Sequence, residues 1–425
     1  MILFGGKIYP TDRQSELLGI LEKRINRTLA FGNLDRETVI SALDDLAVRI
    51  ALGRYDKLIA GFAPDDVTRY KNAAITAMKR ENLETRLAVE LPDNIMAGRT
   101  GSLIHSVRPL GTIMHIAAGN ADGLPALSVL EGLVTGNVNI LKLPSADNGI
   151  TIKILTELIE TAPEIADYIY VFDTPSADVD AMRKMADISD GIVVWGGETA
   201  VRAVRALAPA GAKLIEWGHR LGFAYISGYE NENAELTALA KHIAETGQML
   251  CSSCQTIYLD TYDTDTLDMF AEKFLPVLER AADAYLHTDI GASAQLSVNR
   301  YCERLESAAG FSRRKDRHTL YGKNCSITVC RGSTLELSGM YANVLVKRLP
   351  EKHILPVLRR TKGTLQTAGL ICSPEKRDRL TEMLIRSGVN RVMRAGDMSA
   401  SFTGEAHDGE YPLRRYIRNT DTEIL

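Results

Sequence analysis

The pattern of apolar residues changes once along the chain. Between residues 12 and 91, apolar side chains recur every three or four positions, as at Leu17, Leu21 and Ile25, which is typical of amphipathic helices. From residue 110 onward, short apolar runs alternate with helical stretches. The pattern therefore predicts a helical N-terminal segment followed by an α/β fold.

The apolar runs in the middle of the chain predict a doubly wound, largely parallel sheet, because strands that alternate with helices are joined by crossover connections. The stretch 100–109 alternates only in part and ends in proline, which predicts an edge or linking strand rather than a central one. Further strands are predicted at 110–118, 137–143, 168–173, 191–195, 213–217 and 223–227.

A second α/β unit is predicted after residue 230. It has helices at 233–249, 266–285, 294–309 and 375–386, and strands at 255–260, 326–329, 344–349, 365–372 and 390–395. We therefore expect a helical segment at 1–95, two doubly wound domains at 96–230 and 231–396, and a closing segment at 397–425. The closing segment is expected to return to the first domain or to contact a neighbouring subunit.

Composition excludes several classes of protein. The 425 residues carry a formal net charge of -4 with basic and acidic residues interspersed, so no basic surface for nucleic acid is expected. No uncharged run approaches the ~20 residues of a membrane span. Six cysteines are too few for a disulfide framework in a chain of this length, which favours reduced thiols and a soluble, cytoplasmic protein.

The segment 245–255 holds the strongest candidate for chemistry. Cys251 lies where a helical pattern ends and an apolar strand begins, a junction at which a thiolate can be exposed and held by backbone amides. Its polar neighbours Gln248 and Gln255 would be unusual in a packed core. Cys251 and Cys254 also form a C-x-x-C, which leaves a redox pair, half of a zinc site or two buried structural residues as alternatives.

The carboxyl ends of the parallel strands are the second place to look, because ligands of doubly wound sheets bind there. The loops at those ends are 118–121, 142–145, 195–198 and 216–219. None of them matches G-x-G-x-x-G, so the ordinary dinucleotide fingerprint is absent. The segment 195–199 does open a helix after an apolar strand, where backbone amides can bind a phosphate.

Together with these loops, the motif Gln248-x-x-Cys251-Ser-Ser-x-Gln255 resembles the aldehyde dehydrogenase superfamily, and within it the acyl-CoA reductases of the bacterial-luminescence type. The resemblance covers about residues 100–418. It departs from those reductases at Met249, where a second glutamine is usual, and at Cys254, where proline is common. It implies an aldehyde-dehydrogenase-like fold, with the cofactor on domain 96–230 and the nucleophile on domain 231–396.

The resemblance also implies further site residues. Asn120 resembles the asparagine whose amide holds the oxyanion, and Glu216 resembles the glutamate that serves as acid or base. Ordinary roles for such residues, in turns, at strand ends or on the surface, stay open. The implied cofactor residues are Lys142 and Ser145 for the adenosine ribose or its 2′-phosphate, Gly196, Gly197, Glu198 and Thr199 for the pyrophosphate, and Glu336 for the nicotinamide ribose.

The implied activity is NADPH-dependent reduction of an acyl thioester to an aldehyde through a thioester on Cys251, with NADH as the alternative cofactor and no metal. The acyl donor would be acyl-CoA or a partner acyl-protein synthetase, and the protein would be a homo-oligomer. Two rivals stay open. One is another acylating member of the superfamily, a short-chain CoA-acylating aldehyde dehydrogenase or a glutamyl phosphate reductase, and the other is a non-catalytic C-x-x-C protein that binds metal or stores oxidising equivalents.

Overall fold

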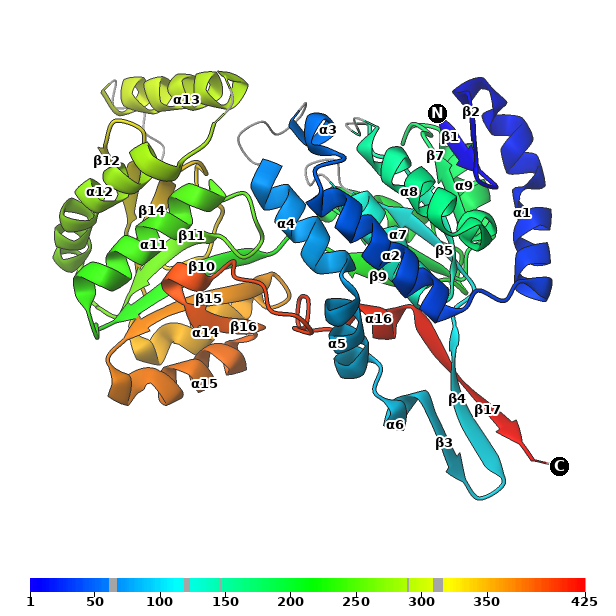
Figure 1. Cartoon of the computed structure of the whole chain (residues 1–425). Coiled ribbons are helices and arrows are strands. Elements are labelled where there is room, and N and C mark those ends of the chain that lie inside the picture. Colours follow the sequence, from blue (N-terminus) through cyan, green and yellow to red (C-terminus); the bar gives the residue numbers. More distant parts are fainter. Residues whose placement is uncertain are drawn as a thin grey trace. The chain divides into compact units, whose positions relative to one another are not determined.

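The computed structural model describes residues 1–60, 67–117, 123–145, 147, 149–288, 290–308 and 316–424 (Figure 1). These residues form two compact units, one made of residues 1–218 with 402–425 and the other of residues 219–401. The four ranges expected from the sequence stay a prediction. Among the described helices, none is long and apolar enough to cross a membrane.

The first unit begins with a β-hairpin that the apolar pattern did not predict. Strands β1 (Ile2–Phe4) and β2 (Lys7–Tyr9) are too short to show a clear period, and β1 adds antiparallel to β7 (Ile169–Phe172). The predicted helical segment follows. It consists of α1 (Gln14–Phe31), α2 (Arg36–Ala51), α3 (Asp56–Ala60), α4 (Val67–Met78), α5 (Arg80–Glu90) and α6 (Asp93–Met96).

The large sheet of the first unit has the order β2-β1-β7-β6-β5-β8-β9. From β7 to β9 its strands are parallel, and the chain returns after β7 to place β8 on the free side of β5. The carboxyl end of β5 is therefore a topological switch point, where ligands of such sheets bind. The remaining elements are β5 (Thr112–Ile116), α7 (Leu124–Val134), β6 (Val138–Lys142), α8 (Ile150–Thr161), α9 (Val179–Asp187), β8 (Gly191–Trp195), α10 (Glu198–Leu207) and β9 (Lys213–Trp217).

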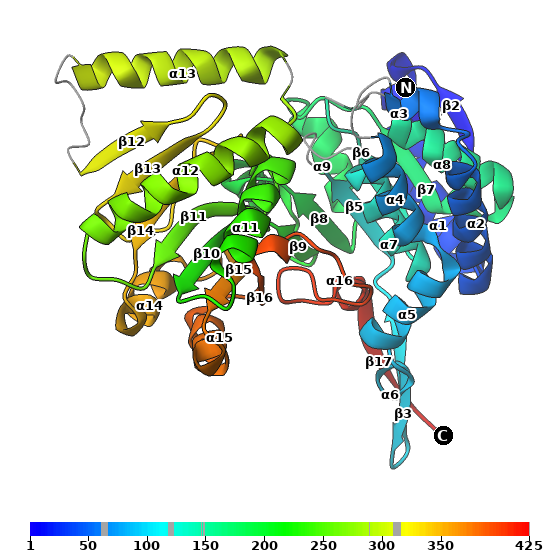
Figure 2. The ribbon, with the colours of Figure 1, turned by 60° about the vertical axis from the view of Figure 1, so that its left-hand side comes forward.

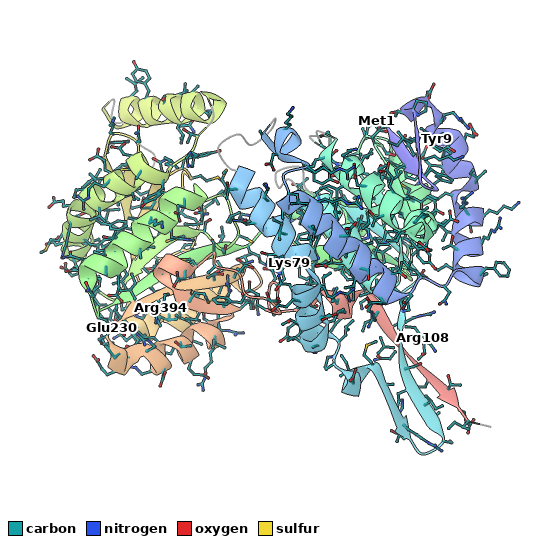
Figure 3. The ribbon with its side chains drawn as sticks, in the orientation of Figure 1. Met1, Tyr9, Lys79, Arg108, Glu230 and Arg394 are labelled. Atoms are coloured by element: carbon teal, nitrogen blue, oxygen red, sulfur yellow. The ribbon has the colours of Figure 1, made fainter. Side chains whose placement is uncertain are left out.

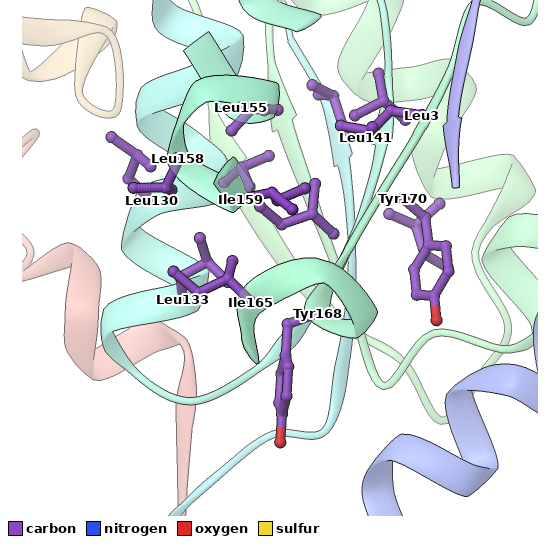
Figure 4. Packing of buried hydrophobic residues seen from close by; sticks show 14 of the residues in the cluster. Leu3, Leu130, Leu133, Leu141, Leu155, Leu158, Ile159, Ile165, Tyr168 and Tyr170 are labelled. Atoms are coloured by element: carbon purple, nitrogen blue, oxygen red, sulfur yellow. The ribbon is translucent and has the colours of Figure 1, made fainter. Parts of the chain in front are cut away.

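Apolar side chains occupy both faces of these strands. Ile192 of β8 belongs to the main core, in which Leu141, Leu155 and Ile159 pack together (Figure 4), whereas Val193 belongs to a second cluster on the other face. Strands buried on both faces read as continuous apolar runs. This is why the bounds predicted for β8 coincide with those observed. The bounds of the edge strand β9 also coincide, although only its Ile215 and Trp217 are buried.

A small antiparallel sheet corrects one prediction. It has the order β17-β4-β3, with β3 (Ala97–Thr100), β4 (Leu103–Pro109) and β17 (Ile417–Glu423), so β4 is its central strand rather than an edge or linking strand. Pro109 is tolerated because it ends the strand, where one missing N–H interrupts little of the ladder. Residues 402–425, which include α16 (Pro412–Arg415) and β17, belong to the first unit.

The second unit has a seven-stranded sheet of order β12-β13-β14-β11-β10-β15-β16, parallel except for the edge strand β12. Helices α11 and α12 cover one face, and α14 and α15 cover the other (Figure 2). The short helix α14 and the strand β12 were not predicted, and the five residues of β12 are mostly polar. The bounds are β10 (Leu221–Ser227), α11 (Glu232–Thr246), β11 (Cys254–Leu259), α12 (Asp265–Tyr285), α13 (Ile290–Ala308), β12 (Arg317–Tyr321), β13 (Ser326–Cys330), β14 (Asn343–Arg348), α14 (Ile354–Leu358), β15 (Leu365–Cys372), α15 (Arg377–Ser387) and β16 (Arg391–Arg394).

Most charged side chains lie outside these cores. Figure 3 labels four exposed ones from separate elements and loops, namely Lys79, Arg108, Glu230 and Arg394. Buried titratable groups are exceptions, and each of them can make the stability of the fold depend on pH.

His242 of α11 is one such exception and predicts a pH dependence of stability. Burial lowers its pKa to about 4, and its Nε2 has no hydrogen-bond partner among the described residues. An unfolded histidine titrates near pH 6.5, so below that pH the unfolded chain binds the extra proton and stability falls as pH falls toward 4. Relative to the parent, His242→Leu should gain about 2 kcal/mol between pH 7 and pH 5, measured by urea unfolding at both values. An unchanged pH dependence would contradict this origin.

Candidate active site

Cys251 and Cys254 lie in very different surroundings. Helix α11 ends at Gly247, which has the left-handed φ of 54° common at helix ends, and the chain then forms the cysteine loop, residues 248–253. Cys251 is exposed in this loop. Cys254 is the first residue of β11 and fully buried, and burial raises its pKa to about 12. At neutral pH, Cys254 is therefore an inert core thiol, whereas Cys251 is accessible to reagents.

Two reciprocal pairs of hydrogen bonds close the cysteine loop. Gln248 Nε2 donates to the carbonyl of Cys254 at 2.8 Å, and Gln255 Nε2 donates back to the carbonyl of Gln248 at 2.7 Å. Inside this pair, the amide of Leu250 donates to Ser253 Oγ at 3.1 Å and the amide of Ser253 donates to the carbonyl of Leu250 at 3.0 Å. Each bond contributes about 1 kcal/mol, so the loop is held in one shape.

The glutamines on either side of Cys251 are thus buried residues whose hydrogen bonds hold the cysteine loop in place. Gln248 and Gln255 are 1% and 2% exposed, although their polarity had suggested an open environment. Gln248 also has a φ of 61°, an uncommon value for a residue with a side chain. Such strain persists only where surrounding contacts enforce it, and it is frequent at functional sites.

A second segment carries the predicted ribose ligand Glu336 and contacts the residues on both sides of the cysteine loop, Gly247 and Gln255. Ser338 donates from Oγ to Gln255 Oε1 at 2.7 Å, and the amide of Tyr341 donates to the carbonyl of Gly247 at 2.8 Å. Three consecutive residues here, 340–342, have left-handed φ values between 47° and 60°. The structure therefore brings the segment of Glu336 and the loop of Cys251 together within the second unit.

Glu336 itself is held by two cations. Arg317 donates from Nη2 to both carboxylate oxygens, at 2.7 and 2.9 Å, and the buried Lys347 donates to Oε1. Burial opposes ionisation of Glu336, but the hydrogen bonds from Lys347 and Arg317 outweigh it and lower its pKa. Glu336 is therefore an oriented anion, suited to accept hydrogen bonds from hydroxyl groups of a ligand.

The cysteine loop lies at the amino-terminal edge of the second sheet. It is followed directly by the first residue of β11, and it contacts the first residues of the neighbouring strands β10 and β15. Gly222 of β10 makes this possible, because a Cβ at that position would lie 2.6 Å from the carbonyl oxygen of Ser253 and 2.8 Å from that of Ser252. The rule that ligands bind at carboxyl ends therefore does not locate Cys251.

Gln366 is a site residue that the sequence analysis missed. Its Nε2 donates to Cys251 Sγ at 3.1 Å, across 115 positions of sequence. Nothing in the local pattern of β15 distinguishes this glutamine from any polar residue of a strand. Only the pairing of β15 with β10 brings it to the cysteine loop.

The first unit places the other predicted residues at the carboxyl edge of its sheet. Lys142 ends β6, Ser145 is exposed in the following turn, and Gly196 and Gly197 lead from β8 into α10, followed by the exposed Glu198 and Thr199. Asn120, after β5, lies outside the described residues. Because β6 and β8 flank β5, the lysine and the glycine turn lie on either side of the switch point.

These residues fit the phosphates of a dinucleotide. Gly197 caps the N-terminus of α10, and no atom of the residues that the structure describes lies within 4 Å of the position that a Cβ would take there. The carboxylate of Glu198 is paired with Arg202 at 2.5 Å, which reduces its repulsion of an anion. Burial lowers the pKa of Lys142, whose Nζ donates to Ser176 Oγ at 3.0 Å, so a bound phosphate would favour its charged form.

Glu216 of β9 is engaged by an arginine. Arg205 of α10 donates from Nε to Oε1 at 2.5 Å and from Nη2 to Oε2 at 2.6 Å, a bidentate pair. The carboxylate is partly exposed, so water competes for it. The structure thus orients Glu216 within the first unit, and its catalytic role stays a prediction.

Comparison with solved structures defines the class of fold. Glyceraldehyde-3-phosphate dehydrogenase GapN from Methanocaldococcus jannaschii, complexed with NADP, matches with a TM-score of 0.69 over 98% of this chain and 95% of its own, at 13% identity. Aldehyde dehydrogenase 21 from Physcomitrella patens matches with a TM-score of 0.69 over 98% and 91%, at 12% identity. The chain has the aldehyde dehydrogenase fold, with a helical N-terminal segment, as predicted.

Comparison of sequences then gives the family. Long-chain acyl-protein thioester reductase 2 from Photobacterium leiognathi is 24% identical over 73% of this chain and 63% of its own length. The long-chain acyl-protein thioester reductase from Aliivibrio fischeri is 23% identical over 75% and 65%. The matches thus cover less than two thirds of these relatives. The acyl-CoA reductase (LuxC) family model matches residues 33–419, so the chain belongs to this family, which confirms the predicted resemblance.

Proposed function

We propose that this protein reduces an acyl thioester to an aldehyde, and that Cys251 carries the acyl group between the two half-reactions. The observation that supports this most directly is an exposed Cys251 on a braced loop in a chain of the acyl-CoA reductase family. Because the relatives are named long-chain acyl-protein thioester reductases, the proposed donor is a long-chain acyl-CoA or an acyl-protein synthetase. The proposed setting is a cytoplasmic homo-oligomer.

In the first half-reaction, the Cys251 thiolate attacks the carbonyl carbon of the donor. A new S–C bond forms and the carbonyl electron pair moves to oxygen. The backbone N–H of Cys251 and the Asn120 amide are proposed to hold this oxyanion. When the carbonyl re-forms, the bond to the donor's sulfur breaks, the donor leaves as a thiolate and the acyl group stays on Cys251.

The second half-reaction converts the Cys251 thioester to a thiohemiacetal, and a reduced nicotinamide, NADPH with NADH as the alternative, would supply the hydride when bound. Collapse of the thiohemiacetal then releases the aldehyde and the Cys251 thiolate. The proposed binding residues are Lys142 and Ser145 for the adenosine ribose or its 2′-phosphate, Gly196, Gly197, Glu198 and Thr199 for the pyrophosphate, and Glu336 for the nicotinamide ribose.

Glu216 is proposed to move the proton of the thiohemiacetal oxygen. Both carboxylate oxygens accept hydrogen bonds from Arg205, and opening one of these bonds would leave an oxygen available to this proton. The pair is partly exposed, and exposed ion pairs contribute only about 0–1 kcal/mol, so opening it costs little.

The test of this function compares acyl donors. Purified protein is incubated with NADPH and, separately, with long-chain acyl-CoA, acetyl-CoA and glutamyl phosphate, and NADPH oxidation and aldehyde are both measured. We expect oxidation with long-chain acyl-CoA and one aldehyde per NADPH consumed. Oxidation with glutamyl phosphate alone would overturn the proposal in favour of a glutamyl phosphate reductase.

Lys142 provides a test of cofactor choice. Lys142→Met removes the charge proposed to meet the 2′-phosphate, so KM for NADPH should rise about tenfold or more while KM for NADH changes little. Steady-state kinetics with both cofactors measure the two values. The matched control is Lys184→Met on α9, an exposed lysine that should leave both unchanged. Equal increases for both cofactors would place Lys142 away from the 2′-phosphate.

A further inference from the structure

Gln366 makes a contact that the proposed chemistry does not yet use. Its side chain is 6% exposed, and its Nε2 lies 3.1 Å from Sγ of Cys251. Sulfur accepts hydrogen bonds weakly as a thiol and strongly as a thiolate, because bonds to an ionised partner are about twice as strong as neutral ones. The contact is therefore most stabilising when Cys251 is ionised.

The sheet is irregular where it positions this carboxamide. Opposite Gly222 of β10, two residues of β15, Gln366 and Thr367, take the place of one, and on the other side of Gly222 one extra residue, Gln255, is inserted into β11. Such β-bulges re-aim side chains and are frequent beside active sites. Both bulges lie next to Gly222, and each carries a glutamine that bonds the cysteine loop.

Other contacts hold Gln366 in place. Its carbonyl oxygen accepts from the amide of Asn390 at 3.1 Å, which fixes the backbone. Thr367 Oγ1 donates to Gln366 Oε1 over a long 3.4 Å, so the oxygen is occupied and the nitrogen faces the sulfur. A carboxamide is also neutral at every pH of interest, so its N–H remains a donor whether or not Cys251 is ionised.

We propose that Gln366 is a catalytic residue whose N–H stabilises the Cys251 thiolate. This assignment rests on the proposed function. The thiolate exists twice in that sequence, before it attacks the donor and again when the thiohemiacetal collapses. In the collapse, the hydroxyl loses its proton, the C=O bond forms, the C–S bond breaks and its electron pair returns to sulfur. Gln366 donates one hydrogen bond to that sulfur and undergoes no covalent change.

Two substitutions test whether the N–H of Gln366, rather than the space its side chain fills, acts on Cys251. Gln366→Met keeps a similar length without an N–H, and Gln366→Glu keeps the shape but places a carboxylate beside the sulfur. Alkylation of Cys251 by iodoacetamide is followed over a range of pH by peptide mass spectrometry. The midpoint of the Cys251 profile should move up by about one pH unit in Gln366→Met, with about tenfold slower alkylation at neutral pH, and further in Gln366→Glu.

Cys302, exposed on α13 of the same unit, is the control within each sample. Its profile should be the same in parent and variants, and thermal unfolding of each variant shows that the fold persists. Acylation of Cys251 by acyl-CoA should recover in both variants at high pH, because only the thiolate population is reduced. A purely structural role would not be rescued in this way. If the pH profiles of Cys251 alkylation in the folded variants coincide with that of the parent, Gln366 does not stabilise the thiolate.

The alkylation needs neither acyl donor nor nicotinamide, so the two proposals fail separately. A shifted midpoint in a protein that takes up no acyl group would remove the proposed reductase function and leave the thiolate contact standing. If Cys251 is acylated in the parent but the midpoint of its alkylation profile shifts in neither variant, the role of Gln366 is wrong and the proposed reductase function stands.

Discussion

Replacing Cys251 with serine should abolish retention of an acyl group and reduce aldehyde formation by about 10³-fold or more. A serine hydroxyl is scarcely ionised at neutral pH and has no adjacent base assigned to it, whereas a thiolate is itself the nucleophile. The fold should persist, because the hydrogen bonds that close the cysteine loop come from Gln248, Gln255, Leu250 and Ser253. The measurement is the intact mass of the protein after incubation with acyl-CoA in the absence of reductant.

Cys254→Ala is the matched control for this experiment. Cys254 is fully buried and its pKa is raised to about 12, so it should take no acyl group, and alanine leaves no buried hydroxyl without a partner. The variant should gain the mass of one acyl group, as the parent does. If Cys251→Ser and Cys254→Ala both acylate like the parent, the nucleophile lies elsewhere. Acylation lost only in Cys254→Ala would reverse the assignment of the two cysteines.

Gly222→Ala should lower the rate of Cys251 acylation by about 10²-fold, although residue 222 carries no reactive group. The new Cβ would lie 2.6 Å from the carbonyl oxygen of Ser253 and 2.8 Å from that of Ser252. These are main-chain atoms, which cannot relieve the clash by a change of side-chain rotamer. The cysteine loop must therefore shift, and a misplacement of about 1 Å at a reacting centre costs about 10²-fold. Overpacking should also cost about 1–3 kcal/mol of unfolding free energy.

The rate of acylation and the urea unfolding midpoint measure these two effects. Gly332→Ala is the control in the same unit, because within the described part of the chain no atom lies within 4 Å of its added Cβ, and its backbone is outside the left-handed region. It should match the parent in both measurements. A folded Gly222→Ala variant that acylates at the parent rate would show that the close approach of β10 does not hold the cysteine loop.

Prediction of the fold succeeded where a signal was local and strong. β8, β9 and β15 were predicted at their observed bounds. For β8 the reason is that a strand buried on both faces reads as an unbroken apolar run between polar turns. The hairpin of β1 and β2 is too short to show a period, and β12 is a mostly polar edge strand. The central place of β4 was missed because Pro109 suggested an edge, whereas a proline at the last position of a strand removes little of its ladder.

The local pattern was enough to identify Cys251 as the candidate nucleophile and to predict the α/β fold, because each depends on residues that are neighbours in sequence. The family resemblance combined several such local motifs along the chain. Other features depended on residues far apart in the chain. These include the burial of Cys254, the contact between Gln366 and Cys251, and the use of Gln248 and Gln255 as buried braces. They follow from the pairing of β10 with β11 and β15, which local propensity does not encode. Tertiary packing alone therefore determined which cysteine is accessible and which side chain contacts its sulfur.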